Sequence, residues 1–267
     1  MVKQPFITTV EVVPPAGPDP GRLLAALTKV ATRPIDGFSV ATNPVAKARM
    51  SALVLCHLIR QATGKPAILH LTTRDHNRLS LQGELWGARA LGIDTVMVAS
   101  GDFVAFEDRE HTSTVRDVDV CTLVAMAREA GLRTGVVFDP RPESDGLARA
   151  VAHLERKAAA GAQFVVTQPV YDPLDADTLA AATRAAGIPV ILGILPLRSH
   201  RHAEFLHTRV AGISIPRPLR EAMRTADDPV ATGITNARDM LAAARRAFAG
   251  ACVMPPFDHY DMLADIL

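Results

Sequence analysis

The sequence predicts an α/β protein in which residues 1–267 form a single (β/α)₈ TIM barrel. Short apolar runs rich in β-branched residues alternate along the whole chain with runs rich in alanine and leucine. This alternation is typical of a parallel sheet whose faces are covered by helices. Eight apolar runs are present, and eight parallel strands favour a closed barrel over an open doubly wound sheet, the alternative architecture.

The predicted elements follow one another without a linker or a domain boundary. The predicted strands span residues 7–14, 37–42, 67–73, 95–101, 134–140, 164–169, 190–196 and 251–257. The predicted helices span residues 21–31, 46–62, 76–91, 120–130, 147–160, 175–186 and 239–249. Glycines suited to left-handed helix caps follow five helices, at Gly64, Gly92, Gly131, Gly161 and Gly187. Residues 102–116 and 197–228 remain as long loops, and such loops in a compact barrel tend to have a function.

Composition and cysteine usage restrict the possible partners. Lysine and arginine (29) nearly balance aspartate and glutamate (28), so we expect no nucleic-acid partner and no membrane partner. The chain lacks an apolar leader and any apolar run of about 18 residues, so we expect a cytoplasmic protein. Cys56, Cys121 and Cys252 are scattered and odd in number, which predicts reduced, mostly buried thiols. The outer helix faces fit a monomer or a small homo-oligomer.

Polar residues gather at the predicted carboxyl ends of the strands, where barrel enzymes place their chemistry. Metal-ligand spacings, glycine-rich phosphate loops and a nucleophile elbow do not occur, so we expect no metal site. The polar residues at the strand ends are Glu11, Thr42, Asn43, His70, Thr72, Thr73, Ser100, Asp102, Asp139, Thr167, Gln168, Asp258, His259 and Tyr260.

Glu11 is the strongest candidate for a catalytic residue. It lies inside an apolar strand between Val10 and Val12, where an ionised carboxylate is costly unless it is paired. Burial raises the pKa of a carboxyl group and allows it to act as an acid near neutral pH. The alternative is a structural glutamate bonded to a buried lysine or arginine.

Three further residues have a functional and a structural interpretation. His70 alternates with Leu69 and Leu71, so its side chain is expected inside the barrel, as a ligand contact or as a satisfied core residue. Asp102 follows Gly101, whose small size allows close approach of a ligand, although aspartates there also cap loops. Gln168 can both donate and accept hydrogen bonds, as a pterin edge requires, or it can tie down its own loop.

The chain also resembles one family, the bacterial methylenetetrahydrofolate reductases. Residues 70–102 (HLTTRDHNRLSLQGELWGARALGIDTVMVASGD) resemble the third strand, third helix and fourth strand of that family. The segment VEVVPP (10–15) resembles its first strand, which carries a glutamate. Further blocks resemble the family in the same order, at 39–53, 155–172, 193–197 and 253–262.

The resemblance implies a fold, a reaction and a set of site residues. The family is a (β/α)₈ barrel with FAD at the carboxyl ends of the strands. NAD(P)H reduces the flavin, and methylenetetrahydrofolate then accepts a hydride to give methyltetrahydrofolate. Glu11 matches the general acid, Asp102 the aspartate between flavin and pterin, and Gln168 the folate-binding glutamine. Further matches imply cofactor contacts by Thr42, His70, Ser100, Gly101, Asp102, Phe138 and Lys157, and substrate contacts by Leu206 and His259.

Departures from the family pattern concentrate where relatives hold the adenosine part of FAD. Ala41 replaces a threonine, and residues 138–143 (FDPRPE) lack an expected histidine. In the last block, His259 stands in place of an arginine that contacts the folate in relatives. Residues 103–116 lack the two prolines that often follow the aspartate, and Arg116-Asp117 and Ala150 also depart from the pattern.

These departures leave several functions open. The chain is expected to bind FAD through altered contacts, with two alternatives. One is direct hydride transfer between nicotinamide and folate, and the other is a paralogue that runs in the oxidising direction. A folate-binding methyltransferase, or a partner barrel without redox chemistry, represents a different class of function.

Overall fold

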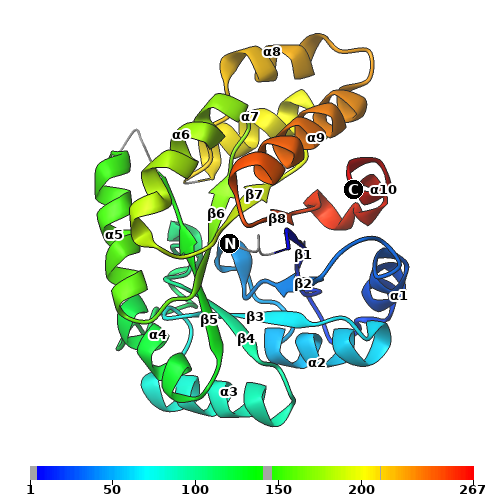
Figure 1. Ribbon diagram of the computed structural model, residues 1–267. Helices are drawn as coiled ribbons and strands as arrows, with labels where there is room; N and C mark the ends of the chain where they lie inside the picture. Colours follow the sequence, from blue (N-terminus) through cyan, green and yellow to red (C-terminus); the bar gives the residue numbers. More distant parts are fainter. Residues whose placement is uncertain (1–4, 141–145, 211) are drawn as a thin grey trace.

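The computed structural model describes residues 5–140, 146–210 and 212–267. All eight predicted strands form, and they close a parallel barrel in chain order, with the last strand paired to the first (Figure 1). The strands are β1 (Ile7–Val12), β2 (Gly37–Val40), β3 (Ala67–Thr72), β4 (Thr95–Ala99), β5 (Arg133–Phe138), β6 (Phe164–Pro169), β7 (Val190–Ile194) and β8 (Gly250–Val253). The prediction of a (β/α)₈ barrel is therefore confirmed.

Helices surround the barrel (Figure 1). The longer ones are α1 (Gly21–Val30), α2 (Ala52–Thr63), α3 (Arg78–Ala90), α4 (Val120–Glu129), α5 (Leu147–Ala159), α6 (Pro173–Thr183), α7 (His200–Arg209), α8 (Arg217–Thr225) and α9 (Pro229–Ala247). Short elements are η1 (Pro44–Ala46), η2 (Phe106–Asp108), η3 (Arg184–Ala186), η4 (Pro256–Asp258), η5 (Tyr260–Met262) and α10 (Leu263–Ile266). Within the described ranges, no helix has the length and apolar character needed to cross a membrane.

Local side chains define many helix ends. Six helices begin with a capping residue whose side-chain oxygen accepts a hydrogen bond from a backbone N–H of the first turn. The capping residues are Ser51, Asn77, Asp119, Asp172, Ser199 and Asp228. Each such cap stabilises a helix by about 1 kcal/mol. The five glycines expected to follow helices all have positive φ, which confirms their prediction as left-handed caps.

Two predicted boundaries were wrong. The helix predicted at 46–62 begins at Ala52, because the preceding residues form a left-handed turn and Ser51 caps the helix. The segment 197–228, predicted as a loop, contains α7 and α8, and α9 begins at Pro229 instead of residue 239. Three histidines and two arginines interrupt the apolar face of α7. In α8, Leu219 and Met223 lie four residues apart on one apolar face, so the sequence did contain a signal for this helix.

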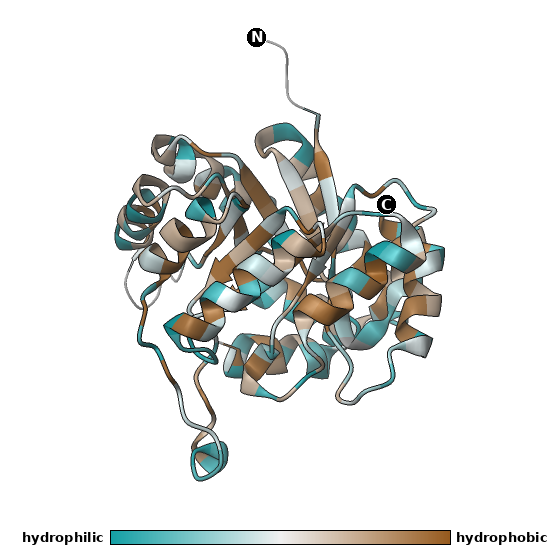
Figure 2. Cartoon of the chain, turned by 90° about the horizontal axis from the view of Figure 1, so that it is seen from below, coloured by the Kyte–Doolittle hydropathy of each residue, from teal (hydrophilic) through white to brown (hydrophobic). Residues whose placement is uncertain are grey.

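The interior of the barrel is filled with side chains. Met97, Phe164, Val166, Ile191 and Cys252 pack together there as one buried cluster. Gly135 on β5 makes room for the Phe164 ring, because a Cβ at this glycine would lie 2.3 Å from the ring. The opposite strand faces pack against the helices in the main hydrophobic core. Figure 2 shows the same division, with brown strands at the centre and most teal residues on outer helices and loops.

Candidate active site

Glu11 lies on β1 at the carboxyl ends of the strands, the open end that we call the barrel mouth. Its register partner on β2 is Ser39. Burial, and secondly the negative charge of Asp102, raise the pKa of Glu11 to about 7. A carboxyl group with this pKa holds a proton in a large fraction of molecules at neutral pH, which suits a general acid.

Three further residues lie near Glu11. Ser39 and Cys252 were not among the predicted polar residues of the strand ends, whereas Tyr260 was. Ser39 Oγ lies 2.7 Å from His70 Nε2. Burial, followed by the charge of Glu11, raises the pKa of the Cys252 thiol to about 12. Burial, followed by the charges of Asp258 and Glu11, raises the pKa of Tyr260. Strand alternation was the available signal for Ser39, since it lies two residues after Gly37 on the inner face of β2.

His70 lies inside the barrel on β3, as the alternation of the sequence indicated. Burial lowers the pKa of its imidazole to about 3, so the ring is neutral at physiological pH. Its hydrogen bond with Ser39 fixes the ring against β2. His70 therefore adds an uncharged polar edge to the wall of the site and no positive charge.

Asp102 is held at the mouth by the loop that follows β2. Its Oδ2 accepts the backbone N–H of Val45 at 2.6 Å, while the residue itself is exposed. The preceding Gly101 has a φ of +78°, and a Cβ there would lie 2.9 Å from the Cβ of Arg74. Only glycine fits this backbone without strain, and this explains the Gly-Asp pair in physical terms.

Arg74 joins three loops of the mouth and was not predicted as a site residue. Its side chain is 2% exposed, and it donates to both carboxylate oxygens of Asp75 at 2.5 and 2.7 Å. It also donates to the carbonyl oxygens of Asn43 at 3.0 Å and of Asp102 at 3.3 Å. Arg74 thus fixes the backbone that presents Asp102.

The loop after β2 has an unusual backbone. Asn43, Val45 and Ala46 have φ values of 40°, 50° and 56°, in the left-handed region that non-glycine residues avoid. Backbone strain of this kind persists where surrounding contacts impose it, and it clusters at functional sites. Here the contacts are the hydrogen bonds from Val45 to Asp102 and from Arg74 to Asn43.

Among the described residues on the opposite side of the mouth, Phe138 and Lys157 both make contacts within the protein. Phe138 on β5 is 2% exposed and packs in the helix-facing core, so its ring lies apart from Glu11 and Asp102. Lys157 on α5 donates to the carbonyl oxygen of Val137 at 2.8 Å, and burial lowers its pKa. Residues 141–143 of the predicted FDPRPE segment lie outside the described residues.

The remaining expected site residues are dispersed around the mouth. Gln168 is half-buried on β6, where the register with β7 shifts between Val166 and Pro169. Thr42 is half-buried and Ser100 is exposed. His259 lies 3.6 Å from the Asp261 carboxylate in the turn after β8.

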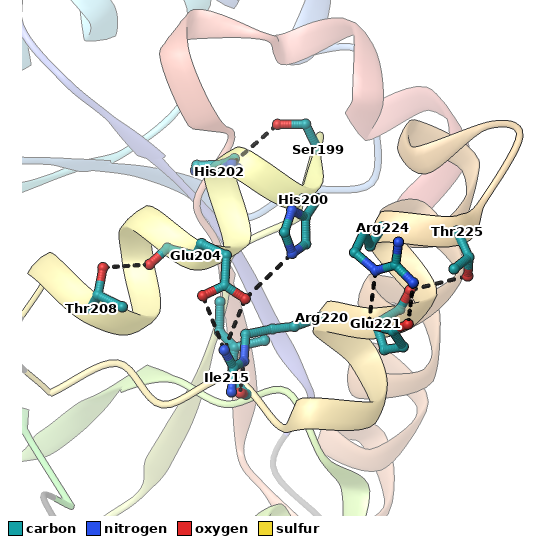
Figure 3. A network of polar contacts seen from close by, with 10 residues as sticks. All are labelled: Ser199, His200, His202, Glu204, Thr208, Ile215, Arg220, Glu221, Arg224 and Thr225. Atoms are coloured by element: carbon teal, nitrogen blue, oxygen red, sulfur yellow. Dashed lines mark hydrogen bonds and ion pairs between the residues drawn. The ribbon is translucent and has the colours of Figure 1, made fainter.

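Leu206 belongs to a small helical unit beside the mouth. Its side chain packs with Tyr171, Leu197 and Met223 in a separate apolar cluster beneath α7 and α8. Figure 3 shows Glu204 of α7 between Arg220 of α8, which it meets at 2.8 and 3.0 Å, and His200. A Cβ at Gly212, between these helices, would lie 2.9 Å from the Asp139 carboxylate, so this unit reaches the end of β5.

Comparison with known proteins identifies the family. The family model for methylenetetrahydrofolate reductase matches residues 1–246. The chain belongs to this family. It is 24% identical over 174 residues to a probable methylenetetrahydrofolate reductase (NADPH) of Caenorhabditis elegans, covering 62% of the chain and 26% of that protein. It is 26% identical over 192 residues to methylenetetrahydrofolate reductase 2 of Schizosaccharomyces pombe, covering 66% of the chain and 30% of that protein. The matched regions therefore span about a third or less of these relatives.

Several solved structures have the same fold as this protein, although their sequence identity to it is low. A Clostridium thermocellum protein that binds two copies of 5-methyl-5,6,7,8-tetrahydrofolic acid matches with a TM-score of 0.70 and 15% identity, over 98% of this chain and 93% of that one. A 2,3-dimethylmalate lyase of the PEP mutase/isocitrate lyase superfamily matches with a TM-score of 0.57 and 14% identity, over 98% and 79% of the two chains. In the described ranges, no cluster of three or more histidine, cysteine or acidic side chains is arranged to bind a metal.

Proposed function

We propose that this protein interconverts 5,10-methylenetetrahydrofolate and 5-methyltetrahydrofolate, with NAD(P)H as the hydride donor in the reducing direction. The observation that supports this most strongly is Glu11, a carboxyl group with a pKa of about 7 at the barrel mouth beside Asp102. Membership of the methylenetetrahydrofolate reductase family supports the same reaction. Cytoplasmic location and a monomer or small homo-oligomer remain parts of this proposal.

Glu11 supplies the proton that the reduction requires. Protonated Glu11 donates to N10 of the folate, the bond between N10 and the methylene carbon breaks, and the five-membered ring opens to an iminium ion. A hydride from the dihydronicotinamide then adds to the methylene carbon and gives the methyl group. The balance is one hydride from NAD(P)H and one proton from Glu11, which leaves NAD(P)⁺ and 5-methyltetrahydrofolate.

Asp102 and Gln168 orient the pterin in this proposal. One oxygen of Asp102 accepts the Val45 N–H, so the other oxygen is available to accept from a pterin N–H. The charge of Asp102 also helps to keep Glu11 protonated, because it raises the pKa of that carboxyl group. Gln168 offers both a donor and an acceptor from the opposite side of the mouth.

The residues present fit FAD poorly, so we propose direct hydride transfer from the nicotinamide to the folate. Phe138 is buried against the helices, and Lys157 donates to Val137, so neither offers the contact expected of a flavin cradle. His70 is neutral and hydrogen-bonded to Ser39. Ser100 has a short side chain with a hydroxyl group, which offers no positive charge to the pyrophosphate of FAD.

The test is turnover by the purified protein without added flavin. NADH or NADPH is mixed with 5,10-methylenetetrahydrofolate, and loss of the dihydronicotinamide absorbance is compared with formation of 5-methyltetrahydrofolate. We expect turnover by a protein whose visible spectrum lacks flavin bands. Turnover that requires added FAD would restore the flavin mechanism, and folate binding without any nicotinamide oxidation would favour a non-redox folate-binding barrel.

A further inference from the structure

Arg49 lines a hollow of about 380 Å³ at the rim of the mouth, next to the first two strands. The hollow lies between the loop after β1 and the loop after β2. Its other lining residues are small or apolar: Ala16, Gly17, Pro18, Ala48 and Met50. The loop after β1 follows directly from the strand that bears Glu11, so the hollow lies at the same end of the barrel as the proposed reaction site.

The guanidinium of Arg49 is poorly satisfied. Its Nε is buried and has no hydrogen-bond partner among the described residues. The charge of Arg49 is therefore not neutralised by an acceptor within the described ranges, and the part of the guanidinium that lines the hollow can pair with an external anion. The fork of a guanidinium matches the paired oxygens of a carboxylate or a phosphate.

Three arginines of the loops after β3 and β4 already have partners within the protein. Arg74 donates to Asp75 and to two backbone carbonyl groups. Arg109 donates to the Val104 carbonyl oxygen at 3.3 Å and lies over the Phe106 ring, and Arg116 lies over the Phe103 ring. Arg49 differs from these three because its side chain makes no such contact within the described ranges.

The backbone around Arg49 is fixed independently of its side chain. The Arg49 N–H donates to Asn43 Oδ1 at 2.9 Å, and the Met50 N–H donates to the Pro15 carbonyl oxygen at 2.9 Å. The first bond lies within the loop after β2, and the second joins this loop to the loop after β1. The side chain is therefore presented by a pre-organised frame, which lowers the entropic cost of binding a ligand.

We propose that Arg49 forms an anion subsite that binds the negatively charged end of one of the two substrates, an inference that rests on the proposed function. The shared chemistry is a pair of anionic oxygens attached to a group that fits a small apolar hollow. Two sources have this chemistry: the glutamate carboxylates of the folate tail and the pyrophosphate of NAD(P)H.

Equilibrium binding of two ligand pairs distinguishes the folate tail from the pyrophosphate. The dissociation constants are measured for the wild type, Arg49→Met and Arg49→Lys. The first pair is 5-methyltetrahydrofolate and 6-methyltetrahydropterin, which lacks the tail. The second is NADPH and dihydronicotinamide riboside, which lacks phosphate. We expect Arg49→Met to weaken one full-length ligand about ten- to a hundred-fold while its truncated partner changes by less than about two-fold. Arg49→Lys should be intermediate, since it keeps the charge without the fork.

Arg33→Met is the matched control, since Arg33 is exposed in the turn before β2 at the other end of the barrel. It should leave all four affinities unchanged. Unchanged binding of both full-length ligands to Arg49→Met overturns the inference, and so does an equal loss for full-length and truncated ligands. A wild-type protein that binds NADPH but no folate overturns the proposed function, and the nicotinamide pair then decides the inference separately.

Discussion

The two sides of the barrel mouth differ in how firmly they hold their polar residues. On the β1–β4 side, Arg74 and Val45 fix Asp102 through hydrogen bonds, and Asp102 in turn raises the pKa of Glu11. On the β5–β7 side, Phe138 is turned into the helix-facing core and Lys157 is bonded to a strand carbonyl group. The difference suggests that acid chemistry depends on the first side, whereas the second side tolerates change.

The largest effect is expected from Glu11→Gln. Removing the proton donor should lower turnover of methylenetetrahydrofolate by about 10²- to 10⁴-fold, the usual contribution of general acid catalysis. The affinity for NAD(P)H, measured by fluorescence titration, should change little because Glu11 serves the folate step. If nicotinamide binding falls as strongly as turnover, Glu11 has a structural role and the two sides do not differ as proposed.

Arg74→Ala should have the next largest effect. The substitution leaves Asp75 and the carbonyl groups of Asn43 and Asp102 without their donor, which typically costs about 3–5 kcal/mol of unfolding free energy. Urea unfolding measures this loss, and Arg74→Lys should restore part of it because the charge remains. A loss below about 1 kcal/mol, the level of an exposed ion pair, would mean that Arg74 does not organise the β1–β4 side.

Asp102→Asn should shift the pH dependence of folate reduction. In the wild type, kcat/KM should fall as pH rises through about 7, because Glu11 loses its proton there. Asparagine can still accept the Val45 N–H but has no negative charge, so the pKa of Glu11 falls and the decline moves to lower pH by up to about 1 unit. An unchanged pH profile would show that the charge of Asp102 does not influence the pKa of Glu11.

The smallest effect is expected from Lys157→Met on the β5–β7 side. Its ammonium group is bonded to Val137, so the KM for NAD(P)H should change by less than about two-fold, as for a residue without ligand contact. Steady-state kinetics at fixed folate concentration measures it. A ten-fold rise in KM would show that Lys157 turns toward the nucleotide, and the contrast between the two sides would fail.

The fold was predictable because every strand is an apolar run and a glycine cap precedes five of the strands, β3 to β7. The strand ends also located Glu11, His70 and Asp102 correctly at the mouth, since parallel strands all end at one edge. The sequence did not predict that the Phe138 side chain faces the helices. A strand that is apolar on both faces gives no sign of which face lies inside the barrel.

Long-range contacts explain the two features of the mouth that the sequence did not predict. The role of Arg74 was not predicted, since nothing in its neighbours reveals that it reaches carbonyl groups 28 and 31 residues away along the chain. The left-handed turn at Asn43, Val45 and Ala46 was equally hidden, because these residue types rarely adopt such a backbone. Contacts between distant loops impose both features.

The packed barrel interior below Glu11 restricts how this carboxyl group exchanges protons with water. Met97, Phe164 and Ile191 fill the barrel, and Cys252 beside Glu11 is fully buried. Solvent therefore reaches Glu11 from the mouth, and a substrate in the mouth blocks that route. Glu11 can then donate one proton in each turnover, and it is reprotonated by solvent after the product leaves.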